Sequence, residues 1–407
     1  MMKKKVIIGV VFGIVFLVAG FLLITHFTTR NSQNIYGNQE NNSSSQYQEN
    51  QENQEEQNQE EQNNQRGQEI DPNCQLVFTE YLVEPKYVQK FGQVGVVHGG
   101  GKSIVERSYI SIKQDFYEQE IPVYAPADMN LIGAAHYKIP GSPENTLADY
   151  VLKFNTKCNV EILLGHLKKV VPEIDKELPT LQQDSRENYN INRIEFKAGE
   201  LIGYYVQQSQ PGAVSGFDFI VRDPRFTNQF INQERYSENR ASNLINGVCP
   251  YDYFTSDKKQ EYYNLLGSAG GKIFTIKDCG TASQDKSGTI SGMWFMEKEV
   301  TKPIYEYESD PKVDYVYGTV LSIAGDEEAV TIGNLGQSAI IRVYYTELSY
   351  KLPTEVTEEH CYEFGFNGQN NGYAYFKLID ASTMDVYYSP SGSCPQTMPS
   401  ESKRYYK

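Results

Sequence analysis

The sequence predicts a mainly β protein that is held at a membrane by one N-terminal helix. Three observations support this fold class. Tyrosine and glycine are abundant, with 31 Tyr and 32 Gly in 407 residues, which is typical of strands joined by tight turns. From about Asp71 onward, short segments alternate between apolar and polar residues. The first 70 residues differ, because one long apolar run there is followed by a very polar segment.

Residues 1–30 predict a single transmembrane anchor. Lysines at positions 3–5 precede Val6–Ile24, which holds only apolar residues and glycine. As a helix this run would be about 28 Å long, close to the hydrocarbon thickness of a bilayer. The lysines predict a cytoplasmic N-terminus and an extracytoplasmic remainder. A cleaved signal peptide is the alternative, but the run is long for one and no A-x-A-like cleavage site follows it.

Residues 31–70 predict a disordered linker. Of these 40 residues, 29 are Gln, Asn or Glu. The segment contains eight Glu and only one basic residue, Arg66. Such a segment cannot bury enough apolar surface to offset the entropy lost on ordering. We therefore expect a solvated tether between the membrane and the rest of the protein.

Three further regions follow the tether. Residues 71–222 predict a β domain, residues 223–299 a disulfide-linked connecting region with short helices, and residues 300–407 a small C-terminal β-rich unit of antiparallel strands. The helices are expected near Ser237–Asn246 and Ser256–Leu266. The expected strands are Val105–Ile112, Tyr150–Phe154, Asn159–Leu164, Leu201–Val206, Phe217–Val221, Val316–Ile323, Ala339–Tyr345, Tyr362–Phe366, Ala374–Asp380 and Met384–Tyr388.

Six cysteines occur without any C-x-x-C pair, which disfavours a zinc ribbon or a thioredoxin-like site. Three disulfides would suit an extracytoplasmic protein. Spacing favours Cys249–Cys279 and Cys361–Cys394, and Cys74–Cys158 would then join the start of the β domain to its interior. The sequence alone leaves the connectivity open.

Charge and motifs exclude several classes of function. The chain carries 52 Asp and Glu against 37 Lys and Arg, a formal net charge of −15, so a basic-patch nucleic-acid binder is excluded. No complete P-loop, G-x-S-x-G or H-E-x-x-H motif occurs. The sequence therefore predicts no cofactor and no nucleic-acid partner.

Four segments, in order, carry a resemblance to one family. They are Ile121–Asp128 (IPVYAPAD), Leu164–Leu167 (LGHL), Phe196–Gly203 (FKAGELIG) and Gly216–Val221 (GFDFIV). Together they resemble the M23 zinc peptidases, the LytM-type or lysostaphin-like family, over about residues 105–221. The resemblance implies a compact antiparallel β-sheet fold built on the duplicated hybrid motif. Met129 replaces the glycine that follows APAD in the family.

The zinc ligands of that family are missing here. The resemblance aligns its H-x-x-x-D pair with Arg107 and Ser111, and its H-x-H pair with Gly216 and Asp218. An arginine cannot be deprotonated and repels a dication, and one carboxylate does not hold zinc. His166 occupies the family's catalytic histidine position without a metal-bound water to activate. We expect no catalytic residue, no metal, and an ion pair between Arg107 and Asp218 across the former zinc position.

The resemblance therefore predicts a pseudo-metallopeptidase of the cell envelope. Its vacated cleft, with candidate residues Arg107, Ser111, His166 and Asp218, would bind an envelope glycan or regulate a partner hydrolase. One alternative is an atypical zinc metallopeptidase with a rearranged site that uses His98, His136, His166 and Asp218. Another is a carbohydrate-binding or adhesive surface protein that uses the C-terminal β unit, because exposed tyrosines can stack on sugar rings.

Overall fold

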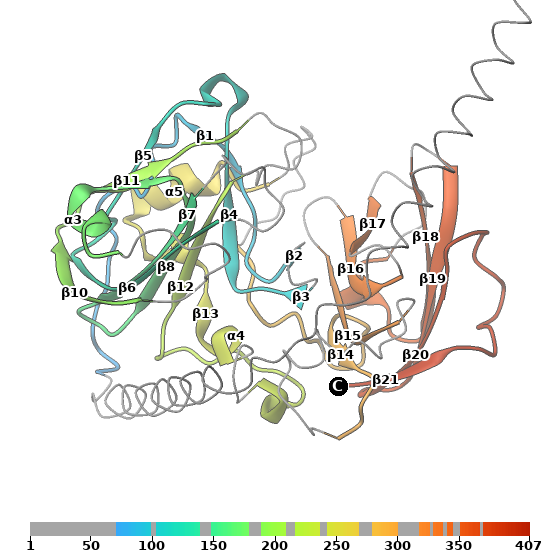
Figure 1. The fold of residues 1–407 in the computed structure, drawn as a ribbon. Helices are drawn as coiled ribbons and strands as arrows, with labels where there is room; N and C mark the ends of the chain where they lie inside the picture. Colours follow the sequence, from blue (N-terminus) through green and yellow to red (C-terminus); the bar gives the residue numbers. More distant parts are fainter. Residues whose placement is uncertain are drawn as a thin grey trace, which may run out of the picture. The chain divides into compact units, whose positions relative to one another are not determined.

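A computed structural model describes residues 71–98, 103–138, 148–178, 189–208, 216–236, 242–267, 279–299, 317–325, 329–336, 340–344, 351–366 and 369–407. The predicted anchor, Val6–Ile24, and the predicted tether, residues 31–70, lie outside these residues. Among the helices of the described part, none has the length and apolar character that crossing a membrane requires. The described residues form a mainly β structure with antiparallel sheets (Figure 1).

The first large sheet contains most of the strands that the sequence predicts between residues 105 and 221. Its order is β1-β4-β12-β8-β7-β6-β10, and β13 pairs with β12. The strands predicted at Tyr150–Phe154 and Asn159–Leu164 correspond to β7 and β8, which pair as a hairpin. The segment predicted at Phe217–Val221 is also a strand of this sheet, whereas the one predicted at Leu201–Val206 is a strand of a smaller sheet. The bounds are β1 Val88–Phe91, β4 Arg107–Ile112, β6 Met129–Lys138, β7 Ala148–Thr156, β8 Glu161–Leu167, β10 Tyr189–Phe196, β12 Phe217–Arg222 and β13 Gly247–Val248.

Two small sheets accompany this large sheet. Three strands pair in the order β5-β11-β9, and β2 pairs with β3 as a short hairpin. Their bounds are β2 Val97–His98, β3 Ser103–Ile104, β5 Ile121–Tyr124, β9 Lys169–Val170 and β11 Leu201–Tyr205.

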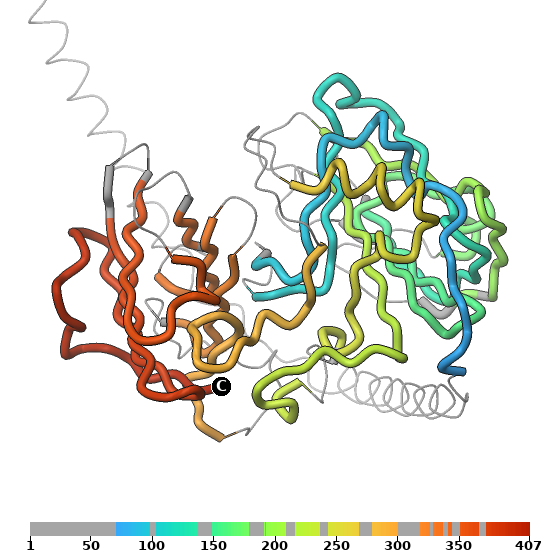
Figure 2. Tube along the Cα trace, turned by 180° about the vertical axis from the view of Figure 1, so that it is seen from behind, coloured from blue at the N-terminus to red at the C-terminus, as the bar shows by residue number. Residues whose placement is uncertain are grey.

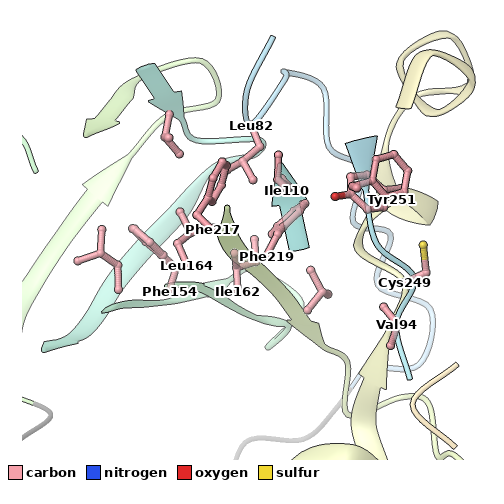
Figure 3. Close-up of a cluster of buried hydrophobic side chains, with 14 of the residues drawn as sticks. Leu82, Val94, Ile110, Phe154, Ile162, Leu164, Phe217, Phe219, Cys249 and Tyr251 are labelled. Carbon is pink, nitrogen blue, oxygen red and sulfur yellow. The ribbon is translucent and has the colours of Figure 1, made fainter. Parts of the chain in front are cut away.

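One face of the first large sheet is apolar and forms the core. Strand β4 alternates between half-buried and buried residues, so Ser108, Ile110 and Ile112 face inward. Figure 3 shows Ile110 beside Phe217, Phe219 and further apolar side chains from β7 and β8. The opposite face of the same strands is therefore free to carry polar residues.

Residues after β12 complete this core. Helix α5, Ser256–Tyr263, lies alongside the segment that contains β1 (Figure 2). The Tyr262 hydroxyl donates to the Val83 carbonyl at 2.8 Å, and the Tyr251 ring stacks on Phe91. Helix α4 spans Ser242–Asn246, and α3, Pro172–Asp175, is a third short helix that the sequence did not predict.

The second large sheet is built from the C-terminal residues. Its order is β17-β16-β15-β14-β21-β20-β19-β18, and the two edge strands β17 and β18 contact each other, so the sheet curls into a near-barrel. Trp294 is fully buried in its core. The bounds are β14 Gly292–Phe295, β15 Tyr317–Gly325, β16 Ala329–Leu335, β17 Ile340–Tyr344, β18 Glu359–Phe366, β19 Gln369–Asp380, β20 Thr383–Ser389 and β21 Lys403–Tyr406.

The two disulfides that the spacing favours form, Cys249–Cys279 and Cys361–Cys394, and so does the remaining pair, Cys74–Cys158. No cysteine is free. The first joins the start of the described chain to the turn between β7 and β8, and the other two close loops of 30 and 33 residues. Their presence fits an extracellular or secreted location.

Candidate functional site

The polar face of the first large sheet carries most of the candidate residues. Arg107, Tyr109 and Ser111 alternate on β4 with the inward-facing residues. Across the β4–β12 pair, Asp218 lies directly opposite Tyr109, and across the β12–β8 pair it lies opposite Gly165. Residues that are directly opposite in an antiparallel pair project from the same face. Asp218 therefore projects among the outward residues of three adjacent strands.

The predicted ion pair between Arg107 and Asp218 is confirmed. Arg107 Nη1 donates to Asp218 Oδ2 at 2.8 Å. The carboxylate side chain is 7% exposed and the guanidinium side chain 29% exposed. Asp218 Oδ1 and Arg107 Nε are buried and make no hydrogen bond within the described residues. This pair is partly buried and uses only part of its hydrogen-bonding capacity.

A β-bulge brings His166 to the same carboxylate. The pairing of β7 with β8 shifts between Tyr150 and Leu152, and His166 has a φ of 66°. A bulge turns a side chain away from the simple alternation of a strand. His166 Nδ1 lies 2.7 Å from Asp149 Oδ2, and His166 Nε2 lies 3.7 Å from Asp218 Oδ2.

We call the residues Arg107, Asp218, His166, Asp149 and Lys168 the Asp218 cluster. Lys168 Nζ donates to Asp149 Oδ1, and the Asp149 side chain is fully buried. The cluster therefore alternates basic and acidic groups from Arg107 to Lys168. This arrangement places the His166 imidazole between two carboxylates. In general acid–base sites, a carboxylate likewise holds a histidine ring in a fixed orientation.

Burial controls the titration of this face. Burial raises the pKa of the Asp218 carboxyl above its ordinary value, although Arg107 and His166 oppose the shift. Burial also raises the pKa of Tyr109 well above its usual range, and the Asp218 charge adds to that effect. Tyr109 therefore stays a neutral phenol in the physiological range and cannot act as a phenolate.

A second charged network lies on the same face and was not predicted. Arg222 Nη2 lies 2.7 Å from Glu106 Oε1, and Arg222 Nη1 donates to Glu161. Lys153 Nζ lies 2.7 Å from Glu161 Oε2. Burial alone would raise the pKa of Glu161, but Arg222 and Lys153 outweigh it and hold that pKa below its ordinary value. The Glu161 carboxylate is therefore ionised at neutral pH.

The remaining predicted residues take other places. Ser111 is two residues further along β4 than Tyr109, opposite Lys90 of β1. His136 stacks on Tyr150 with ring centroids 4.0 Å apart, and His98 ends strand β2, opposite Ser103 of β3. Within the described ranges, no group of three or more His, Cys, Asp or Glu residues is arranged to hold a metal ion.

A pocket of 660 Å³ lies away from the Asp218 cluster. Two of the half-cystines, Cys74 and Cys249, line it together with Arg225, Phe226 and Tyr253. Phe226 is 55% exposed, whereas Arg225 donates to the Cys74 carbonyl. None of the four residues of the predicted cleft lines this pocket.

Comparison with protein-family models, with curated proteins and with solved structures gave no match to this chain. The four motifs lie on β5 and the turn after it, at the end of β8, on the β10–β11 connection and on β12. The M23 resemblance rests on these motifs and stays a prediction.

Proposed function

We propose that this chain is a membrane-anchored extracytoplasmic protein in which residues 71–222 form a degenerate, catalytically inactive M23-like domain. The domain would bind or scaffold components of the cell envelope. The observation that carries this proposal is the contact between Arg107 Nη1 and Asp218 Oδ2 at 2.8 Å. The Arg107 guanidinium, which is always charged, is bound to Asp218. Asp218 is the one carboxylate that the resemblance places among the metal-ligand positions.

Metal-assisted hydrolysis requires several neutral or anionic ligands around an open coordination position. Arg107 supplies a charge that stays positive at every physiological pH. Gly216 offers no side chain, and a Cβ atom there would stand 2.5 Å from the Ile110 carbonyl oxygen. The position therefore has no room for a histidine without a backbone shift. These features support an inactive domain.

The three disulfides support an extracytoplasmic location. The polar face offers an envelope ligand two networks of alternating charge, with Arg107 as a partly exposed cation. A glycan with acidic substituents, or an acidic loop of a partner hydrolase, would complement that cation. We propose an envelope glycan or a partner hydrolase as the binding partner.

Two measurements on the purified full-length chain test the proposal. The first is the zinc content after dialysis against trace zinc. We expect no stoichiometric zinc, whereas one zinc ion per chain, lost in His166→Ala, would support the atypical metallopeptidase instead. The second is sedimentation with purified envelope glycan and capture of envelope hydrolases. Arg107→Ala should weaken binding. Arg404→Ala, which breaks the ion pair of a half-exposed arginine with Asp385 in the other large sheet, is the matched control.

A second candidate is carbohydrate binding by the C-terminal sheet. Tyr373 on β19 and Tyr387 on β20 are half-buried, and their rings stack with centroids 5.8 Å apart. Tyr388, by contrast, belongs to the core. A pair of half-exposed rings can pack against the apolar face of a sugar. Glycan binding that Tyr373→Ala abolishes and Arg107→Ala leaves intact would favour this candidate.

A further inference from the structure

A buried lysine and a buried aspartate face each other beside strand β14. Lys407 follows β21, and Asp285 lies in the segment before β14. Their side chains are 1% and 3% exposed. Lys407 Nζ lies 3.9 Å from Asp285 Oδ1, which is longer than a hydrogen bond. The two groups are therefore adjacent, but no hydrogen bond joins them.

The surroundings of the pair are largely apolar or neutral. Lys407 Nζ donates to the Ser291 carbonyl at 2.6 Å and lies 4.6 Å from the centre of the Trp294 ring. The Ser291 hydroxyl is buried and makes no hydrogen bond within the described residues. A buried charge is costly unless it is paired and hydrogen-bonded. This location disfavours the charged forms of both partners.

The titration of both groups shifts toward the neutral forms. Burial lowers the pKa of Lys407 to about 8, although Asp285 opposes the shift. Burial raises the pKa of the Asp285 carboxyl, although Lys407 and two backbone N–H groups oppose it. Moving one proton from the ammonium to the carboxylate gives an amine and a carboxylic acid without any exchange with solvent.

The carboxyl group of Asp285 is held in place. Ile231 N donates to Oδ2 at 3.0 Å, and Met293 N donates to Oδ1 at 3.3 Å. A Cβ atom at Gly292 would stand 1.9 Å from Oδ1, so glycine leaves the space that the carboxyl group occupies. Backbone donors of this kind polarise a carbonyl and stabilise the oxyanion of a tetrahedral intermediate.

We propose that Lys407 and Asp285 form an intramolecular amide bond. The neutral Nζ attacks Asp285 Cγ, and a C–N bond forms to give a tetrahedral intermediate. A proton then moves from the nitrogen to the departing hydroxyl oxygen, the C–O bond breaks, and one water molecule leaves. No oxidant, metal or cofactor is consumed.

The fold supplies what this reaction requires. Fixing two reactants side by side replaces a bimolecular encounter with a high effective concentration. Exclusion of water favours the uncharged reactants and the release of the water that forms. The product joins the end of β21 to the segment before β14, and these two strands already pair between Phe295 and Tyr406.

Peptide mass spectrometry of the reduced, alkylated and denatured full-length chain tests the proposal. Trypsin cuts after Lys277, Lys286 and Arg404. We expect one branched species that contains peptides 278–286 and 405–407, lighter than their sum by the mass of one water molecule. Complete recovery of the two peptides as separate, unmodified species would overturn the proposal, whatever any variant does.

Two variants identify the bond. Lys407→Arg keeps the positive charge but lacks the attacking amine, so the branched species should vanish. Asp285→Asn should form the same amide, with release of ammonia in place of water. Its branched peptide would then have the same mass as the one from the unchanged chain. A branched species that persists in Lys407→Arg would exclude this lysine as the attacking group.

Discussion

Gly165 lies directly opposite Asp218 across the β8–β12 pair, and a Cβ atom at residue 165 would stand 2.8 Å from Asp218 Oδ2. The carboxylate that accepts from Arg107 therefore occupies the space that any other residue at position 165 would fill. The placement of Asp218 depends on this glycine as well as on the arginine.

Gly165→Ala should destabilise the first large sheet by about 1–3 kcal/mol, because an added methyl group must displace the Asp218 carboxylate. Urea denaturation measures the change in unfolding free energy. Gly92→Ala is the matched control, since a Cβ there meets only Tyr109 atoms at 3.9 Å or more. In an Asp218→Ala background the cost of Gly165→Ala should shrink, and an undiminished cost would show that the collision lies elsewhere.

Arg107→Ala should lower the unfolding free energy by about 2–4 kcal/mol, because it leaves the buried Asp218 carboxylate without its cation. Adding Asp218→Asn to that variant should restore part of the loss, since the amide carries no charge. Arg404→Ala breaks a pair with Asp385 in which the arginine side chain is 51% exposed, and it should cost less, about 1 kcal/mol. Equal losses in both single variants would contradict the buried character of the Arg107–Asp218 pair.

Acidification should destabilise the fold through His136. Burial lowers the pKa of His136 below its ordinary 6.5, and its buried Nε2 makes no hydrogen bond to any residue that the structure describes. As the pH falls below 6.5, His136 takes up a proton in the unfolded chain before it does so in the folded chain. Its contribution to the free energy of unfolding is therefore complete above pH 6.5 and is lost as the pH drops. His136→Phe keeps an aromatic ring against Tyr150 and removes the titration. The slope of unfolding free energy against pH should be shallower in this variant between pH 6.5 and 5.5.

Removing the Cys74–Cys158 disulfide should cost more than removing either of the other two. It spans 84 residues, against 30 and 33 for the others. In the loop-entropy description the longer loop corresponds to about 4.5 kcal/mol and the shorter ones to about 3.5–4 kcal/mol. Thermal unfolding of paired Cys→Ala variants measures the order. A larger loss for Cys361→Ala with Cys394→Ala would contradict an entropic origin.

Alternation and spacing predict much of the β structure. The pattern of β4 places Arg107, Tyr109 and Ser111 on one face, because successive side chains of a strand point to opposite sides. Together with the family resemblance, it anticipates the ion pair with Asp218. The favoured cysteine pairs also form.

Alternation and spacing do not predict other features of the fold. Strand β16 is almost continuously buried and β14 is buried throughout, so neither shows the alternation that predicts a half-buried strand. Asp149 and Lys168 belong to the Asp218 cluster because a β-bulge redirects the side chain of His166. The periodicity of a sequence does not predict where the pairing of two strands shifts by one residue.

The disulfide between Cys74 and Cys158 has a mechanical consequence. A pull applied to the chain ahead of residue 74 reaches the β7–β8 turn through a covalent bond. The backbone hydrogen bonds of the following residues, such as Phe78 to Tyr253, are thereby shielded from that load. Force then enters an interior hairpin of the sheet, whose two strands are each paired on both sides. A tension that would peel away a terminal strand must here shear a hairpin embedded in the sheet.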